Sequence, residues 1–130
     1  WQTLLNLVIL PRRSPKSAAR YAQVWMKEGA PLKVYTDRIA DKLHQRLQEN
    51  GIDAEVFVGM RYGTPSQVSV FKTIHNEYGF DRVLVLPLYP QYSSSTTASV
   101  SDALSAALQQ MKSHPKVRFI RDYHRHPFYM

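Results

Sequence analysis

The apolar run VLVLPL at residues 83–88 is the strongest constraint on how this chain of 130 residues folds. A short run rich in Val and Leu, without polar alternation, predicts a strand buried on both faces, as in a parallel sheet covered by helices. Pro90 cannot donate a hydrogen bond to a sheet, and it restrains Tyr89 to an extended conformation. We therefore expect the strand to give way to a loop at Tyr89.

A row of hydroxyl side chains, SSSTT at residues 93–97, follows this loop. The hydroxyls can accept hydrogen bonds from the first N–H groups of a helix. Ligands of open α/β sheets bind outside the carboxyl ends of the strands, so residues 89–97 are predicted to form the wall of a site. A strand–loop–helix corner also needs polar caps without any ligand, and the two interpretations carry equal weight here. The helix itself is indicated by an apolar stripe: Val100, Leu104, Ala107, Leu108 and Met111.

The remaining pattern predicts helices followed by β-α-β-α-β. Strands that alternate with helices in this way favour right-handed crossovers and a parallel sheet. We therefore expect an α/β fold, a three-layer Rossmann-like parallel sheet flanked by helices, in one domain covering residues 1–130. After a break at residues 11–13, we expect a helix from Ser14-Pro15 to about Lys27 and a second helix from a cap at Thr36 to Asn50-Gly51. A strand is expected at 54–60, followed by a helix that runs from a capping box at 64–67 to Gly79. A further strand is expected at 117–120.

Composition narrows the classes of function. The chain has no cysteine, which excludes disulfides, thiolate metal sites and thiol catalysis within this segment and fits a reducing compartment. We expect a cytoplasmic location, with peripheral contact with the inner membrane as an alternative. The net charge of +7 suits nucleic acid, anionic lipid or an acidic ligand. Nucleic-acid motifs and a G-x-G-x-x-G loop are absent, so a ligand bearing carboxylates is at least as good an interpretation.

The segment LPLYPQYSSSTTAS, at residues 86–99, closely resembles the signature loop of ferrochelatases, the enzymes that insert ferrous iron into a porphyrin. Further segments resemble the same family in the same order, most closely its bacterial members: residues 10–36, 56–66 and 117–129. The resemblance implies that the full-length protein inserts Fe²⁺ into protoporphyrin IX to form protohaem. Porphyrin and ferrous iron are then the expected partners, and nucleic acid is not.

The resemblance also implies that this chain is most of the N-terminal domain of a two-domain chelatase, truncated at both ends. The family's opening strand, ending in Asn-Leu-Gly-Thr-Pro, would precede Trp1. The metal-site histidine, in a Ser-x-His-Gly-x-Pro motif, and a glutamate would follow Met130 in the missing C-terminal domain. We therefore expect no catalytic residue and no metal ligand in this segment, and an inactive fragment.

The candidate residues of this segment are substrate-binding ones. Planar guanidinium groups suit the propionates of a porphyrin, and Arg12 and Arg13 lie beside a loop. From the residues alone a solvated basic pair is favoured, whereas the resemblance singles out Arg13, with Tyr21. Arg61 and Tyr62 lie at the carboxyl end of a predicted strand, where ligands bind in such sheets. The alternative is a structural role, with Arg61 in a salt bridge and the Tyr62 ring packed against the protein. Rings and hydroxyls for a flat macrocycle, or for packing and capping, come from Tyr89, Gln91, Tyr92, Ser93, Ser95 and Thr96.

Two positions depart from the family pattern. Ala30 stands where the family usually has a serine that contributes to the porphyrin pocket. Ser94 stands where many members carry a cysteine that ligates a [2Fe–2S] cluster, so we expect no cluster and no other cofactor in this segment, with Fe²⁺ as substrate. His124 and His126 could form a metal pair on an extended segment, but a solvated loop is favoured by about four to one.

Two other functions stay open. One is a related tetrapyrrole chelatase that uses another metal. The other is a nonenzymatic Rossmann-like binding domain whose basic surface serves nucleic acid or membrane.

Overall fold

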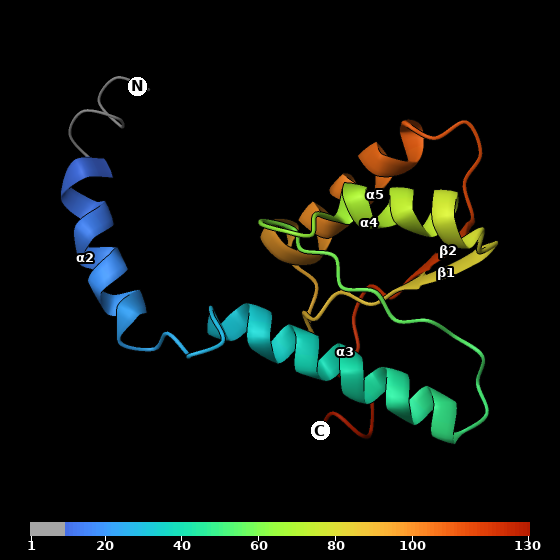
Figure 1. Cartoon of the computed structure of the whole chain (residues 1–130), viewed down its shortest axis with the longest axis horizontal. Coiled ribbons are helices and arrows are strands. Elements are labelled where there is room, and N and C mark those ends of the chain that lie inside the picture. Colours follow the sequence, from blue (N-terminus) through green and yellow to red (C-terminus); the bar gives the residue numbers. More distant parts are fainter. Residues whose placement is uncertain (1–9) are drawn as a thin grey trace. The chain divides into compact units, whose positions relative to one another are not determined.

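The computed structural model describes the backbone of residues 10–130, and the side chains of residues 14, 15 and 17–130 (Figure 1). The chain divides into two compact units, Trp1–Val56 and Phe57–Met130, and each is described by itself. The single domain expected from the sequence stays a prediction. In the described part of the chain, no helix combines the length and apolar character that a membrane span requires.

Helix α2, Leu10–Ala22, is the first element that the structure describes in the Trp1–Val56 unit. The predicted start at Ser14 and the predicted break at residues 11–13 are wrong, because α2 already includes Leu10 and carries Pro15 inside it. Proline destabilises a helix because it removes one hydrogen-bond donor, but a helix can still contain it. The helix also ends before Lys27. Met26 and Gly29 exchange two backbone hydrogen bonds of 3.1 Å, in a turn that the positive φ of Gly29 permits.

Helix α3, Pro31–Glu49, follows α2 in this unit. It begins with Pro31 in its first turn and not at Thr36, so the predicted cap at Thr36 is wrong. Thr36 instead donates from Oγ1 to the carbonyl of Leu32, at 2.7 Å, within the helix. The predicted stop is confirmed. Gly51 has a φ of 67° and donates to the carbonyl of Gln48 at 2.9 Å.

A two-stranded parallel sheet lies at the centre of the Phe57–Met130 unit. Strand β1, Arg82–Val85, pairs with β2, Lys116–Phe119, and Val83 lies opposite Val117. The connection runs through the π-helix η3, Ser94–Ala98, and helix α5, Ser99–Gln109. This β-α-β unit with parallel strands confirms the α/β class that the sequence predicts.

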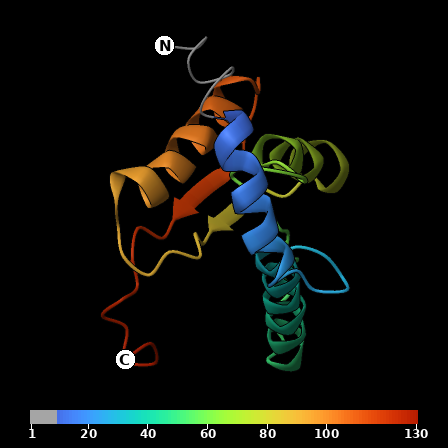
Figure 2. The same ribbon diagram turned by 90° about the vertical axis from the view of Figure 1, so that its left-hand side faces the viewer.

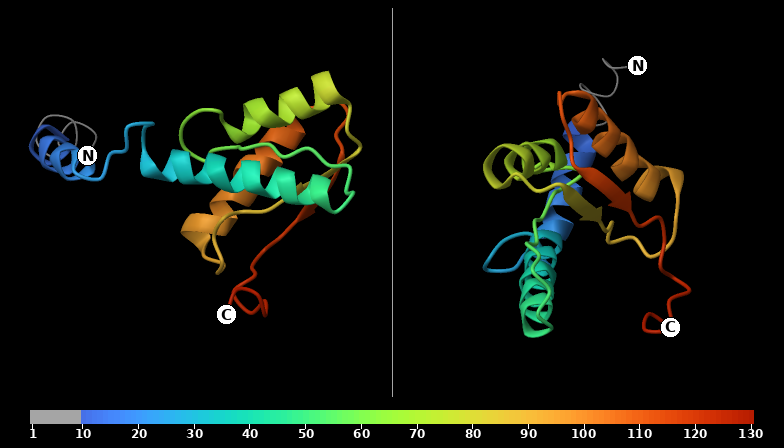
Figure 3. Two further views of the ribbon diagram at one scale, coloured as in Figure 1. Left: turned by 60° about the horizontal axis from the view of Figure 1, so that its bottom comes forward. Right: turned by 90° about the vertical axis from the view of Figure 1, so that its right-hand side faces the viewer.

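Helices α5 and α4, Gln67–Thr73, lie side by side on one face of this sheet (Figures 2 and 3). Their shared core consists of Phe71, Leu104 and Ala107, all buried. The predicted stripe of α5 is confirmed at Val100, Leu104 and Ala107, which are its buried residues, whereas the predicted Met111 lies beyond the end of the helix. Partly buried side chains complete the core: Val68, Val83, Val85, Leu108, Val117 and Phe119.

The other face of the sheet is uncovered within this unit. Leu84 is 62% exposed, and Leu86, just past the strand, is 45% exposed. The prediction of a strand buried on both faces is therefore wrong for this unit, in which both helices pack on a single face. The strand is also shorter than the apolar run, because the buried Pro87 cannot extend the ladder.

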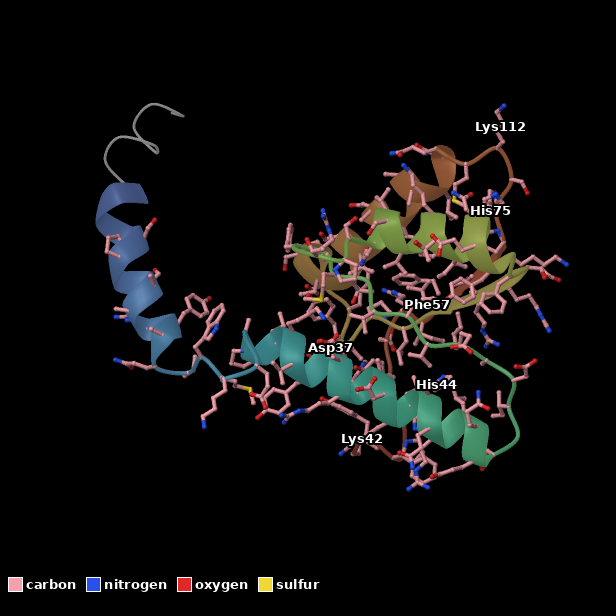
Figure 4. The ribbon with its side chains drawn as sticks, in the orientation of Figure 1. Asp37, Lys42, His44, Phe57, His75 and Lys112 are labelled. Atoms are coloured by element: carbon pink, nitrogen blue, oxygen red, sulfur yellow. The ribbon has the colours of Figure 1, made fainter. Side chains whose placement is uncertain are left out.

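The strand predicted at residues 54–60 is not formed. Residues 52–59 have no regular structure, and Met60 makes only an isolated bridge with Ser66. Phe57 packs edge-on against Tyr78, with ring centres 5.0 Å apart (Figure 4). An apolar segment forms a strand only beside a partner, and the described residues supply none here.

The helix predicted to end at Gly79 is formed by α4 and the π-helix η2, Ile74–Tyr78. Its observed end agrees with the prediction more closely than its observed start does. Gly79 closes it with a φ of 64°, as predicted. The cap is Ser66 and not Thr64. The Ser66 hydroxyl accepts a 3.2 Å hydrogen bond from the N–H of Ser69.

Candidate functional site

An open pocket of about 420 Å³ lies on the loop that follows β1. The carboxyl ends of parallel strands are where α/β proteins bind ligands, and the loop was predicted to form a site wall on that ground. Ser95, also predicted, does not line the pocket but contacts Ser93, whose Oγ lies 3.2 Å from its own. The structure thus gathers most of the loop's predicted site residues around one space. The lining consists of Tyr89, Pro90, Gln91, Tyr92, Ser93, Thr96 and Tyr129.

The hydroxyl row does not cap the helix as predicted. Ser93 occupies the N-cap position of η3, yet its side chain makes no capping hydrogen bond. Its Oγ lies 2.6 Å from Oγ1 of Thr96, and its carbonyl accepts from the N–H of Ala98 at 3.1 Å. The buried Thr97 donates to the carbonyl of Gln91 at 3.5 Å. The hydroxyls therefore bond to one another and to the loop, because the wide first turn carries its own backbone bonds.

The C-terminal segment, residues 120–130, runs beside this loop (Figure 3). The N–H groups of Tyr123 and His124 both donate to the carbonyl of Pro90, at 2.9 and 3.0 Å. The guanidinium carbon of Arg121 lies 4.5 Å from the centre of the Tyr92 ring. Tyr129 lines the pocket and packs edge-on against Tyr123, with ring centres 5.6 Å apart. The segment thus supplies a second wall.

Pro90 and Tyr129 are lining residues that the sequence analysis did not single out. Pro90 was interpreted only as the end of a strand. Tyr129 belongs to the segment 117–129, whose resemblance to the family was noted without assigning a role to Tyr129. That resemblance was the one signal that could have pointed to Tyr129.

Arg61 and Tyr62 lie in the loop before α4 and do not line the pocket. Nε of Arg61 donates to Oγ of Ser99 at 2.7 Å, at the start of α5. The Arg61 guanidinium also lies over the ring of Tyr62, 4.6 Å from its centre. Tyr62 is 75% exposed, so its ring is not packed into the core. The hydrogen bond to Ser99 on α5 and the stacking on Tyr62 thus hold the Arg61 side chain. The salt bridge that was considered as the alternative does not hold it.

The remaining candidates belong to the Trp1–Val56 unit. Arg12 and Arg13 lie on α2, and their side chains are outside the described residues. Tyr21 lies near the end of α2 and is 65% exposed. Ala30 occupies the N-cap of α3, where its methyl group makes no capping bond. Their role in porphyrin binding stays a prediction.

Further titratable groups lie in the C-terminal segment beside the pocket. Burial raises the pKa of the Tyr123 phenol above its ordinary value, and the nearby Tyr129 raises it further. Nδ1 of His124 lies 3.8 Å from Oδ1 of Asp122. Nδ1 of His126 accepts a hydrogen bond from the N–H of Phe128 at 3.4 Å. Among residues 10–130, no three His, Cys, Asp or Glu side chains gather as metal ligands would.

Comparison with known proteins gives a match over the whole chain. The ferrochelatase family model matches residues 1–130. A ferrochelatase from Vibrio parahaemolyticus is 51% identical over all 130 residues. The chain spans only 39% of the length of that relative. No solved structure matches the chain.

Proposed function

Because this chain belongs to the ferrochelatase family, we propose that the full-length protein inserts Fe²⁺ into protoporphyrin IX and forms protohaem. Within that protein, this segment supplies walls of the porphyrin pocket. The observation that carries the proposal is the pocket after β1, around which five predicted residues meet: Tyr89, Gln91, Tyr92, Ser93 and Thr96.

The pocket offers two kinds of surface to a porphyrin. The rings of Tyr89 and Tyr92 are 40% and 47% exposed, so they can present flat apolar area to a macrocycle. The hydroxyls of Ser93 and Thr96 and the amide of Gln91 add donors and acceptors at its polar edge. Ser95 supports this edge through its contact with Ser93. A large aromatic ligand with a polar rim fits such a lining.

The proposal also includes basic side chains. Protoporphyrin IX carries propionates, and guanidinium groups bind carboxylates through parallel hydrogen bonds. We assign this role first to Arg13, with Arg12 and Tyr21 beside it on α2, and assign Arg61 and Tyr62 to a second edge of the macrocycle. The fixed hydrogen bond from Arg61 to Ser99 supports this assignment, because it holds the guanidinium in one orientation.

Metal insertion replaces both N–H protons of the macrocycle with Fe²⁺. We assign binding and orientation of the porphyrin to this segment. The metal ligands and the groups that accept the protons are assigned to the part of the full-length protein that this chain does not span. Fe²⁺ is then a substrate, and the isolated segment is expected to be inactive. We place the enzyme in the cytoplasm, with peripheral membrane contact as an alternative.

The test uses the full-length protein with protoporphyrin IX and Fe²⁺ under anaerobic conditions, following the loss of porphyrin fluorescence and the rise of haem absorbance. Tyr92→Leu removes the ring and should raise KM for porphyrin about two- to tenfold, as expected for a lost aromatic contact. Tyr92→Phe keeps the ring and serves as the matched control, with KM close to that of the wild type.

Two results would contradict the proposal. Wild-type protein that inserts another divalent metal but not Fe²⁺ would favour a different tetrapyrrole chelatase. Wild-type protein that inserts no metal, and whose binding to DNA or anionic vesicles falls steeply with salt, would favour a nonenzymatic basic domain.

A further inference from the structure

The loop that carries the pocket depends on the C-terminal segment for its shape. The carbonyl of Pro90 in this loop accepts hydrogen bonds from Tyr123 and His124, and the carbonyl of Gln91 accepts one from Thr97. The Pro90 contacts come from backbone groups of the C-terminal segment, at 2.9 and 3.0 Å. They fix this segment beside the loop but leave the orientation of the Tyr92 side chain undetermined.

Arg121 supplies the missing contact to that side chain. It comes shortly after strand β2, and its guanidinium carbon lies 4.5 Å from the centre of the Tyr92 ring. A guanidinium group within about 6 Å of a ring centre is attracted to the face of the ring. Tyr92 is 47% exposed, so core packing alone does not hold it in one rotamer. The ring face turned to Arg121 is therefore the one held by the protein.

We propose that Arg121 is a positioning residue that holds the Tyr92 ring as a wall of the porphyrin pocket. Arg121 does not line the pocket itself, so it acts on the ligand through Tyr92. The inference rests on the proposed function, because porphyrin is the ligand whose binding the ring would support. It assigns the segment after β2 a role in substrate binding that the sequence analysis did not give it.

The test is a double-mutant cycle in the full-length protein, with porphyrin KM and kcat for iron insertion as readouts. Arg121→Met keeps the length of the side chain and removes the charge, and it should raise porphyrin KM about two- to fivefold, with kcat within about twofold of the wild type. In the Tyr92→Leu background the same change should leave KM unaltered, because the ring it acts on is gone. Arg121→Lys should recover part of the loss, since the ammonium still meets the ring face.

Arg118→Met is the matched control, because Arg118 lies on β2 and is exposed on the uncovered face of the sheet. Its KM should stay within about 1.5-fold of the wild type, below the effect expected of a lost cation–π contact. The proposal is overturned if Arg121→Met leaves KM unchanged, or raises it equally with and without the Tyr92 ring. The latter result would mean that Arg121 contacts the porphyrin directly. A wild-type protein without iron insertion would instead overturn the proposed function, so the two failures are distinguishable.

Discussion

Oγ of Ser93, at the N-cap of η3, lies 2.6 Å from Oγ1 of Thr96, three residues further along the chain. Both residues also line the pocket after β1, so a contact within the helix start places two hydroxyls at the ligand surface. Local structure and site geometry are therefore coupled here. A change at either hydroxyl should affect the stability of the loop and the binding of a ligand together.

Thr96→Val replaces the hydroxyl with a methyl group of similar size, and we expect it to lower the free energy of unfolding by about 0.5–1.5 kcal/mol. In a Ser93→Ala background the same change should have a much smaller effect, because the partner hydroxyl is already absent. Urea unfolding of the four full-length proteins measures this coupling. Equal losses in both backgrounds would show that the two hydroxyls do not support each other.

Leu104→Ala should be among the most destabilising changes in the Phe57–Met130 unit. Leu104 is 6% exposed and packs in the core with Phe71 and Ala107. Removing its side chain leaves a cavity, so we expect a loss of about 2–5 kcal/mol in the free energy of unfolding. The neighbouring Ser105 is exposed on the same helix, and Ser105→Ala should stay within about 0.5 kcal/mol of the wild type. Chemical denaturation followed by circular dichroism tests both, and similar losses would contradict this core.

The sequence predicted helix α5 better than it predicted strand β1. An amphipathic stripe carries its own evidence, because the spacing of Val100, Leu104 and Ala107 shows which side must be covered. A continuous apolar run such as residues 83–88 does not show which face of the strand is covered. It led to the prediction of two buried faces, whereas one face is covered in the Phe57–Met130 unit. The strand predicted at residues 54–60 was wrong for a related reason. Strand formation depends on a partner strand, and a local sequence pattern does not show whether one is present.

The site divides in the same way. Residues of one loop, such as Tyr89 and Tyr92, were found because they are close in sequence and follow a strand. Tyr129 and Arg121 reach the loop through contacts between residues distant in the chain: the parallel pairing of β2 with β1 and the hydrogen bonds of the C-terminal segment to Pro90. The hydroxyl row was predicted to cap a helix, and the π-helical first turn, which no residue pattern announced, redirected its bonds.

Ser66→Ala tests the cap of α4. The Ser66 hydroxyl accepts from the N–H of Ser69 at 3.2 Å, so the alanine variant leaves that donor without its side-chain partner. We expect the free energy of unfolding to fall by about 0.5–2 kcal/mol. Ser66→Asp keeps an acceptor at the cap and should stay near the wild type. Thermal denaturation of the three proteins decides the matter, and a Ser66→Asp variant as unstable as Ser66→Ala would exclude capping as the cause.

Tyr123→Phe tests how the second wall of the pocket responds to alkaline pH. Burial, with help from Tyr129, holds the pKa of Tyr123 above its ordinary value, so the folded protein keeps the phenol proton more tightly than the unfolded chain does. Between the unfolded and the folded pKa the folded state binds more protons, and stability must fall as pH rises through this window. Below the unfolded pKa the contribution is fully present.

We therefore expect wild-type protein to lose stability in this alkaline window more steeply than Tyr123→Phe does. Urea unfolding at a series of pH values from about 9 to about 11, bracketing the ordinary tyrosine pKa near 10, measures the two slopes. Tyr62→Phe, the same change at a side chain that is 75% exposed, serves as the matched control. If Tyr123→Phe and the wild type follow the same curve, the phenol is not desolvated in the folded protein, and the packing of Tyr123 against Tyr129 does not shield this wall of the pocket from water.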